Sequence, residues 1–121
     1  MYRILVTGSR DWWSKEVVWE ALQEAYSYCP GGVEAVIVHG ACPSGADSLA
    51  SGWARANKVK IERHPADWKT HGRAAGHIRN REMVKLGADI CLAFIRDNSR
   101  GASGTADMAE KAGIPTLRFT E

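Results

Sequence analysis

The sequence predicts an α/β domain of the Rossmann-like, doubly wound kind, with about five mainly parallel strands and helices on both faces of the sheet. Three observations predict it. Strand-like and helix-like segments alternate from one end of the chain to the other. Several strand-like segments are apolar at every position, as strands covered on both faces require. Glycine-containing turns follow these strands, where sheets of this kind bind ligands. A length of 121 residues fits a single domain over residues 1–121.

The first half of the chain predicts three strands and two helices. Each strand is a short run rich in β-branched residues, and each helix repeats apolar side chains every three or four positions. Ser14 fits the N-cap of the first helix, and the segment Pro30-Gly31-Gly32 ends that helix. The predicted elements are a strand at 4–7, a helix between Ser14 and Pro30, a strand at 35–39, a helix at about 45–57 and a strand at 59–63.

The second half of the chain continues the alternation. Residues 65–73 are predicted to be irregular and polar, and residues 96–103 to form a polar, glycine-rich loop. The remaining elements are a helix at about 74–86, a strand at 90–95, a helix at about 104–112 that Gly113 ends, and a strand at 115–119.

Composition and charge exclude several classes of protein. A chain that is 45% hydrophobic and 25% charged is typical of globular domains, and a net charge of +2 is too small to indicate a nucleic-acid partner by itself. The three cysteines have no CxxC spacing, which argues against a disulfide framework or a zinc site and favours a cytoplasmic protein with reduced thiols. No metal and no cofactor are expected. No apolar run approaches the roughly 20 residues of a membrane-spanning helix, so no membrane partner is expected.

Gly8-Ser9-Arg10, directly after the first predicted strand, is the first candidate for ligand binding. Gly8 permits a tight turn and a close approach of a ligand to the backbone amides. Ser9 brings a hydroxyl, and Arg10 a planar guanidinium that suits phosphate. Taken alone, the motif fits equally well an ordinary turn with a surface arginine.

The second motif runs from Gly40 to Asp47, after the second predicted strand, and is a glycine-bearing turn. It lacks the Lys-Ser/Thr pair of a Walker A loop. It still leads into a helix N-terminus, where exposed amides and the helix dipole favour an anion. Asp47 either caps this helix, which is the more common role, or accepts a hydrogen bond from a ribose or a base.

A third motif, Gly101-Ala102-Ser103-Gly104-Thr105, follows the fourth predicted strand and is predicted to open the last helix, with hydroxyls at Ser103 and Thr105. The carboxyl ends of parallel strands meet at one edge of a sheet, so all three motifs are expected to face the same crevice. Their convergence favours a phosphate-bearing nucleotide, or a nucleotide-derived ligand, bound at that edge.

The third helix and the aromatic residues add weaker signals. Arg79 and Arg81 point in different directions on a helix, so one is expected to face the crevice and the other the surface. Aromatic side chains fall into two groups. Three lie in loops on the ligand side, where a ring can stack on a base, namely Trp12, Trp13 and Trp68. Four lie in or near helices and suggest contacts in the core or in a homo-oligomer, namely Trp19, Trp53, Tyr26 and Tyr28.

Together these motifs resemble the SLOG superfamily, named for the SMF/DprA and LOG proteins, and in particular its small YspA-like branch of bacterial and phage proteins. The segments that carry the resemblance are residues 8–10, 39–47, 79–83 and 103–105. It covers nearly the whole chain. The resemblance implies a Rossmann-like fold and a binding or sensor module for a nucleotide or nucleotide-derived ligand.

The resemblance also implies two alternative functions. LOG proteins are phosphoribohydrolases that cleave the N-glycosidic bond of nucleoside monophosphates, and Arg79 and the pair Gly104-Thr105 look like parts of their signature. Met108 stands where that signature has glutamate, so Asp107 or Asp47 would have to act beside Arg79 in catalysis. DprA binds single-stranded DNA, but this chain has no basic stripe, which makes nucleic acid the less favoured partner.

Overall fold

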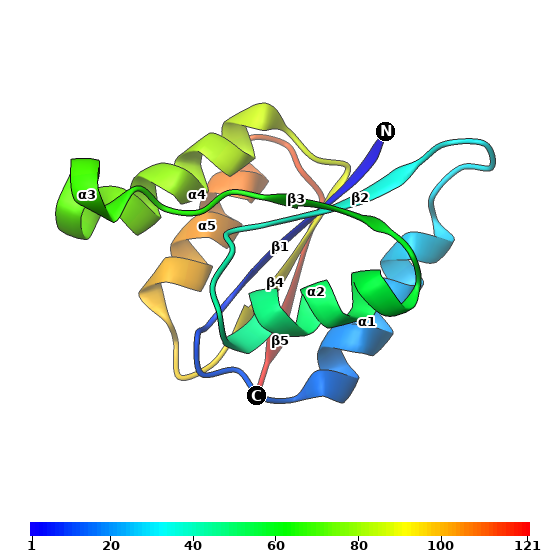
Figure 1. Cartoon of the computed structure of the whole chain (residues 1–121), viewed down its shortest axis with the longest axis horizontal. Helices are drawn as coiled ribbons and strands as arrows, with labels where there is room; N and C mark the ends of the chain where they lie inside the picture. Colours follow the sequence, from blue (N-terminus) through cyan, green and yellow to red (C-terminus); the bar gives the residue numbers. More distant parts are fainter.

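The structure, a computed structural model, describes residues 1–121 and contains a single five-stranded sheet (Figure 1). Every neighbouring pair of strands is parallel, and the strand order is β3-β2-β1-β4-β5. The predicted Rossmann-like α/β fold is therefore confirmed. The strands are β1 (Tyr2–Gly8), β2 (Ala35–His39), β3 (Lys60–Arg63), β4 (Ile90–Ile95) and β5 (Thr116–Thr120).

Helices cover both faces of the sheet (Figure 1). Helices α1 and α2 contact each other on one face, and α4 and α5 contact each other on the opposite face. The short helix α3 lies at one end of α4, joined to it by the 3₁₀ turn η1 (Gly72–Ala74). The helices are α1 (Lys15–Ser27), α2 (Gly45–Ala56), α3 (Trp68–His71), α4 (Ala75–Leu86) and α5 (Arg100–Lys111).

The core lies on both faces of the central strands. Ile4 and Val6 of β1 point toward α1 and α2, where they pack in one cluster with Trp53. Leu5, between them, points to the opposite face and packs with Met83 of α4. Because successive side chains of a strand alternate between faces that are both covered, the strand segments show no polar face in the sequence.

The chain reverses the direction of strand order between β1 and β4. After β3, at one edge of the sheet, the connection through α3 and α4 passes back across β2 and β1 and leads into β4. The loops that follow β1 and β4 therefore leave the sheet side by side toward opposite faces. In sheets of this type, ligands bind in the crevice beyond the carboxyl ends of the strands at such a point.

Two predicted loop boundaries are wrong. Residues 68–71, predicted to be irregular, form α3, whose N-cap Asp67 accepts a hydrogen bond from the Thr70 amide at 3.1 Å. Helix α5 begins at Arg100, not at Gly104, so the third predicted motif lies inside the helix. Alanines 102, 106 and 109 recur at helical spacing and are buried on the sheet. This packing outweighs the roughly 1 kcal/mol that each glycine costs in a helix.

The aromatic residues of α1 and α2 fill the space between these helices. Trp53 is buried, and its ring packs edge-on against Tyr26 at a centroid distance of 5.6 Å. The Trp19 indole donates a hydrogen bond to the Leu49 carbonyl at 3.1 Å. Trp12, predicted to lie on the ligand side, is also a core residue and packs against Phe94. The rings of Trp53 and Trp12 are therefore buried by contacts within one chain.

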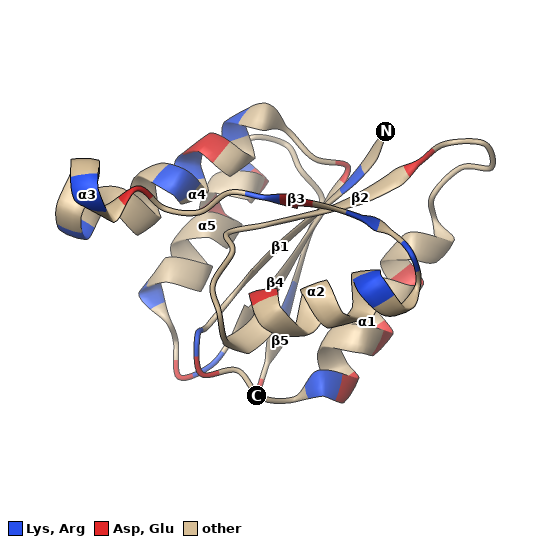
Figure 2. Cartoon of the chain, viewed as in Figure 1, with Lys and Arg blue, Asp and Glu red and all other residues tan.

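Basic and acidic side chains are mixed over the helices and loops (Figure 2). Helix α4, for example, carries arginines, a glutamate and a lysine within its 12 residues. None of the helices is both long enough and apolar enough to cross a membrane.

Candidate functional site

A cavity of about 570 Å³ opens at the carboxyl ends of the central strands, at the switch point between β1 and β4. Its volume lies within the range of roughly 300–1,000 Å³ that is usual for small-molecule sites. Polar and charged residues form most of its wall. Five parts of the chain line it: the end of β1 with the loop after it, the β2–α2 loop, the first turn of α2, helix α4, and the β4–α5 loop with the first turns of α5. The lining residues include Gly8, Ser9, Arg10, Gly40, Cys42, Asp47, His77, Arg79, Asn80, Arg96, Asp97, Ser99, Arg100, Gly101, Ala102 and Gly104.

Gly8 and Gly45 allow the first two motifs to pack directly on each other. A Cβ atom at Gly8 would overlap the Cβ of Ala46, at the start of α2. Gly45 adopts a φ of +70°, and a Cβ there would overlap the backbone carbonyl of Ser9. The two turns are therefore held together by close backbone contact, and any side chain at either glycine would separate them. Gly45 itself does not line the cavity.

Ser9 joins the loop after β1 to the loop after β4. Its amide donates to the Phe94 carbonyl at 2.9 Å, and its Oγ accepts from the Arg96 amide at 2.9 Å. Ser9 is buried and lines the cavity, and its hydroxyl donates to no other protein group. That hydroxyl proton remains available to a ligand.

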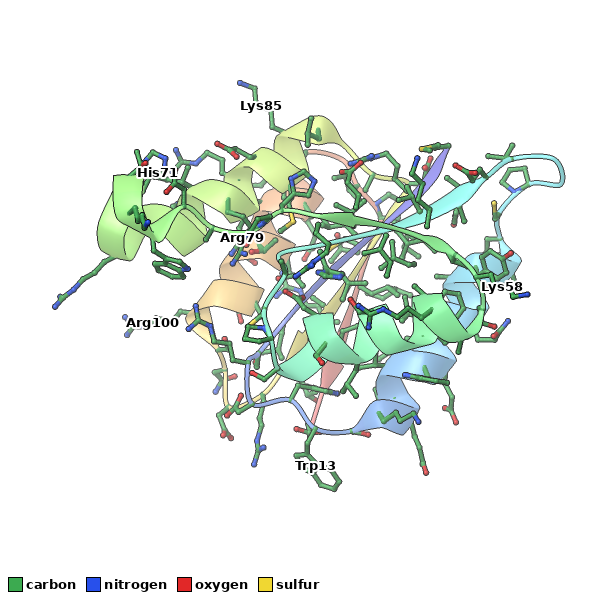
Figure 3. The ribbon with its side chains drawn as sticks, viewed as in Figure 1. Trp13, Lys58, His71, Arg79, Lys85 and Arg100 are labelled. Atoms are coloured by element: carbon green, nitrogen blue, oxygen red, sulfur yellow. The ribbon has the colours of Figure 1, made fainter.

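Arg79 is held rigidly in the wall of the cavity (Figure 3). Its guanidinium donates to the carbonyl of Gly40, to the carbonyl of His64 at 3.3 Å, and to Oδ1 of Asn80 at 2.6 Å. A Cβ at Gly40 would overlap this guanidinium. Glycine at position 40 therefore makes room for the arginine. Arg81, by contrast, lies on the surface and contacts His77, so the two arginines diverge as predicted.

Asp47 is a buried carboxyl group in the same wall. Its side chain accepts a hydrogen bond from the Cys42 amide at 3.2 Å, so it fastens the β2–α2 loop. The N-cap of α2 is Ser44, and its side chain makes no capping bond. Burial raises the pKa of Asp47 to about 6, although the Cys42 hydrogen bond and the charge of Arg79 both oppose that rise. A pKa near 6 brings the titration of this carboxyl close to neutral pH.

The N-terminus of α5 lies at the cavity and carries free backbone amides. The first backbone hydrogen bond of this helix is donated by the Ser103 amide to the carbonyl of the N-cap residue Ser99, at 3.0 Å. The amides of residues 100, 101 and 102 have no acceptor in the chain, and all three residues line the cavity. Such a set of free amides, together with the helix dipole, attracts an anion.

The free amides that attract an anion therefore belong to residues 100–102, at the start of α5, and not to Ser103, Gly104 and Thr105. Gly104 lines the cavity, but the amides of Ser103, Gly104 and Thr105 lie within the hydrogen-bonded helix. Thr105 is fully buried, and its hydroxyl donates to the Gly101 carbonyl at 2.9 Å. Neither Ser103 nor Thr105 lines the cavity.

Sequence reasoning missed two cavity arginines. The Arg96 amide donates to Ser9 Oγ, and the Arg96 guanidinium donates to the Asp11 carbonyl at 2.9 Å. Arg100 is the first residue of α5. Between them, Asp97 and Asn98 both adopt left-handed conformations, with φ of 50° and 54°. The position of these residues directly after a central strand was the available signal, because that is where such sheets bind ligands.

Asp107, predicted as a possible catalytic residue, lies outside the cavity. Its carboxylate pairs with Arg118 of the edge strand β5 at 2.7 Å. Met108 packs beside the core cluster under α4 and α5. Asp107 therefore lies on the exposed side of α5, and neither Asp107 nor Met108 lines the cavity that holds Arg79.

The relationship to known proteins agrees with this geometry. A sequence model of the YspA, cpYpsA-related SLOG family matches residues 2–71, which is more than half of the chain. The chain belongs to this SLOG family. The SLOG domain is also 44% identical to the Gene 61 protein of Mycobacterium phage D29 over 124 residues, covering 98% of this chain and 97% of that protein. No solved structure matches it.

Part of the cavity wall of this SLOG domain falls within the segment that matches the family. That segment contains Gly8, Arg10, Gly40 and Asp47, and ends before Arg79. SLOG domains are nucleotide-binding domains.

Proposed function

We propose that this SLOG domain binds a nucleotide, or a nucleotide-derived ligand with a phosphate group, as a binding or sensor module. The observation that carries the proposal is the meeting of three free amides, at residues 100–102, with Arg10 and Arg79 around one cavity. Amides at a helix N-terminus and guanidinium groups are the protein groups best suited to a phosphate.

Each part of the cavity then has a role. The phosphate lies at the N-terminus of α5, where the amides of residues 100–102 donate to its oxygens. Arg79 supplies a fixed positive charge, because three protein acceptors already hold its guanidinium. The Ser9 hydroxyl donates to the ligand, and Asp47 accepts hydrogen bonds from sugar hydroxyls.

Calorimetry with adenosine and guanosine monophosphates, compared with the matching nucleosides, tests this function. We expect binding that requires the phosphate, and an Arg10→Ala variant that binds at least about tenfold more weakly, since a charge-assisted hydrogen bond contributes roughly 1.5–3 kcal/mol. Arg81→Ala, which removes the same charge from the outward face of α4, is the matched control and should leave affinity unchanged. Absence of binding to any phosphorylated compound at millimolar concentration would exclude the proposal.

A second candidate function is hydrolysis of the N-glycosidic bond of a nucleoside monophosphate. One observation favours it: a buried carboxyl, Asp47, with its pKa raised to about 6, lines the cavity together with Arg79. A carboxyl of that pKa can act as a general acid or base near neutral pH. In this reaction water attacks C1′ of the ribose, the bond to the base breaks, and the base leaves with a proton.

To test the second function, the four common ribonucleoside monophosphates are incubated with the domain, and chromatography detects any free base that is released. If it is correct, Asp47→Asn abolishes release but keeps the monophosphate bound. A wild-type domain that binds these compounds and releases no base would leave the binding module as the function. The mixed distribution of charge offers no comparable support for a single-stranded nucleic acid ligand (Figure 2).

A further inference from the structure

A second, smaller cavity of about 270 Å³ adjoins the first. The two cavities share Arg10, Gly40, Cys42 and Arg79, so the two arginines lie at their junction. The wall of the smaller cavity that is not shared consists of Pro43, Ser44, Ala66 and Trp68. A ligand that fills the larger cavity can therefore extend past the arginines into a space with an aromatic wall.

Trp68 is the aromatic wall of this smaller cavity. It is the first residue of α3, and its side chain belongs to none of the core clusters and is 50% exposed. The Asp67 carboxylate caps α3 by accepting from the Thr70 amide, which fixes the backbone that carries the ring. An indole held in place beside a polar cavity, but left half-open to solvent, presents a flat surface for another flat group.

Arg10 and Arg79 differ in how firmly they are held. Arg79 makes three hydrogen bonds to protein acceptors. The Arg10 side chain makes no hydrogen bond to the protein; its guanidinium carbon lies 5.5 Å from the centre of the Trp68 ring. A cation over an exposed ring is a weak contact of roughly 0.5–1 kcal/mol, so Arg10 can leave the ring at little cost.

We infer that the smaller cavity is the subsite for a planar nucleobase, which stacks on Trp68 in the place that Arg10 occupies, while Arg10 turns to the phosphate. This inference rests on the proposed phosphate site in the larger cavity and narrows its ligand to a complete nucleotide, with base and phosphate both bound. A sugar phosphate or an inorganic anion fills only the first cavity. Stacking discriminates weakly among bases, because every base has a π-face.

Two variants of Trp68 test the inference by calorimetry with adenosine monophosphate, ribose 5-phosphate and inorganic phosphate. Base–aromatic stacking contributes roughly 1–3 kcal/mol. Trp68→Leu should therefore lower the affinity for adenosine monophosphate about 5- to 150-fold, and change the affinity for ribose 5-phosphate by less than about twofold. Trp68→Phe keeps a stacking surface and should retain most of the affinity. Because Trp68 lies outside the core clusters, both variants are expected to fold, which a thermal melt checks.

Trp13→Leu is the matched control. Trp13 is 72% exposed and lines neither cavity, and in Figure 3 its ring projects away from the molecule. Its loss should leave all three affinities unchanged. An unchanged affinity of Trp68→Leu for adenosine monophosphate would overturn the base subsite, as would equal wild-type affinities for adenosine monophosphate and ribose 5-phosphate. If the wild type binds no phosphate compound at all, the phosphate site itself fails, which is a distinct result.

Discussion

Asp47 and Glu62 are two carboxyl groups that the fold shifts in opposite directions. Burial raises the pKa of Asp47 to about 6 from 3.8. Hydrogen bonds from Arg3, and then from His64, lower the pKa of Glu62 to about 2 from 4.5. Glu62 is a partner in an ion pair that holds β3 to β1, whereas Asp47 lies in the cavity wall. The Glu62 carboxylate therefore stabilises the fold, whereas the Asp47 carboxyl is buried in the cavity wall without an ion-pair partner, a combination typical of functional sites.

Asp47→Asn should therefore stabilise the domain at pH 7.5. The native state binds a proton at Asp47 between pH 3.8 and about 6 that the unfolded chain does not bind, so this residue's contribution to stability falls as pH rises through that window. Above pH 6 the ionised group destabilises the fold, on the order of 1–3 kcal/mol, and the neutral amide removes that cost. Urea unfolding of the variant and the wild type at pH 7.5 and at pH 3.8 measures the difference in their free energy of unfolding. The stabilisation of the variant should disappear at the lower pH.

Glu62→Gln is the control with the opposite sign. Because the folded-state pKa of Glu62 is depressed, its contribution is present above pH 4.5 and disappears as pH falls toward about 2. This variant should be less stable than the wild type at pH 7.5. Destabilisation by Asp47→Asn at pH 7.5 would contradict the burial argument for the cavity carboxyl.

The glycines around the cavity are of two kinds: some positions require glycine, and others only tolerate it. At Gly8 and Gly45 a Cβ would overlap atoms of the neighbouring turn, and Gly45 also has a positive φ. At Gly101 and Gly104, in α5, a Cβ would meet no atom within 4 Å. Both kinds look alike in the sequence, where each lies at or shortly after the end of a predicted strand, next to small or hydroxyl-bearing residues.

We expect Gly45→Ala to destabilise the domain by about 2 kcal/mol or more, because the turn carries both steric overlap and left-handed backbone strain. Gly104→Ala should instead stabilise it by about 0.5–1 kcal/mol, because alanine favours helix in the middle of α5. Thermal or urea unfolding of the two variants measures both effects. Equal destabilisation by the two alanines would mean that α5 does not begin at Arg100.

Because required and tolerated glycines look alike in the sequence, it predicts the order of the elements better than their exact starts. Alternating apolar runs and glycine turns indicated the strand and helix order correctly, because they reflect burial on both faces of one sheet. The start of α5 and the existence of α3 were missed, since the first depends on alanines packing on β4 and the second on a single capping aspartate. The gathering of Gly8, Gly40, Asp47 and Arg79 was predictable from their positions at strand ends, while the outward direction of Asp107 depended on the true start of α5.

If the domain self-associates, we expect the contact at the apolar surface beside the edge strand β5. With Trp53 buried inside the chain, the prediction of a homo-oligomer now depends on other residues. An open groove between α1 and β5 is lined mainly by apolar side chains, including Val17, Tyr28 and Leu117. β5 pairs on one side only, with β4, which leaves its other edge free.

Light scattering should accordingly show a mass above the 13.3 kDa of one chain, and Leu117→Lys should restore the monomer. A half-exposed leucine replaced by a charged side chain disfavours association without disturbing the core, since Leu117 is 51% exposed. A wild type that is monomeric at high concentration would contradict this prediction. The cavity lies within one chain, so its ligand binding would stand.

The proposed function requires phosphate to bind where the free amides of α5 meet the turns after β1 and β2. Backbone amide resonances recorded during a titration with adenosine monophosphate test it most directly. We expect the largest shifts at residues 8–10, 40–42 and 99–102, on three separate segments of the chain. Saturable shifts confined to another surface, such as the groove between α1 and β5, with residues 99–102 unmoved, would contradict it.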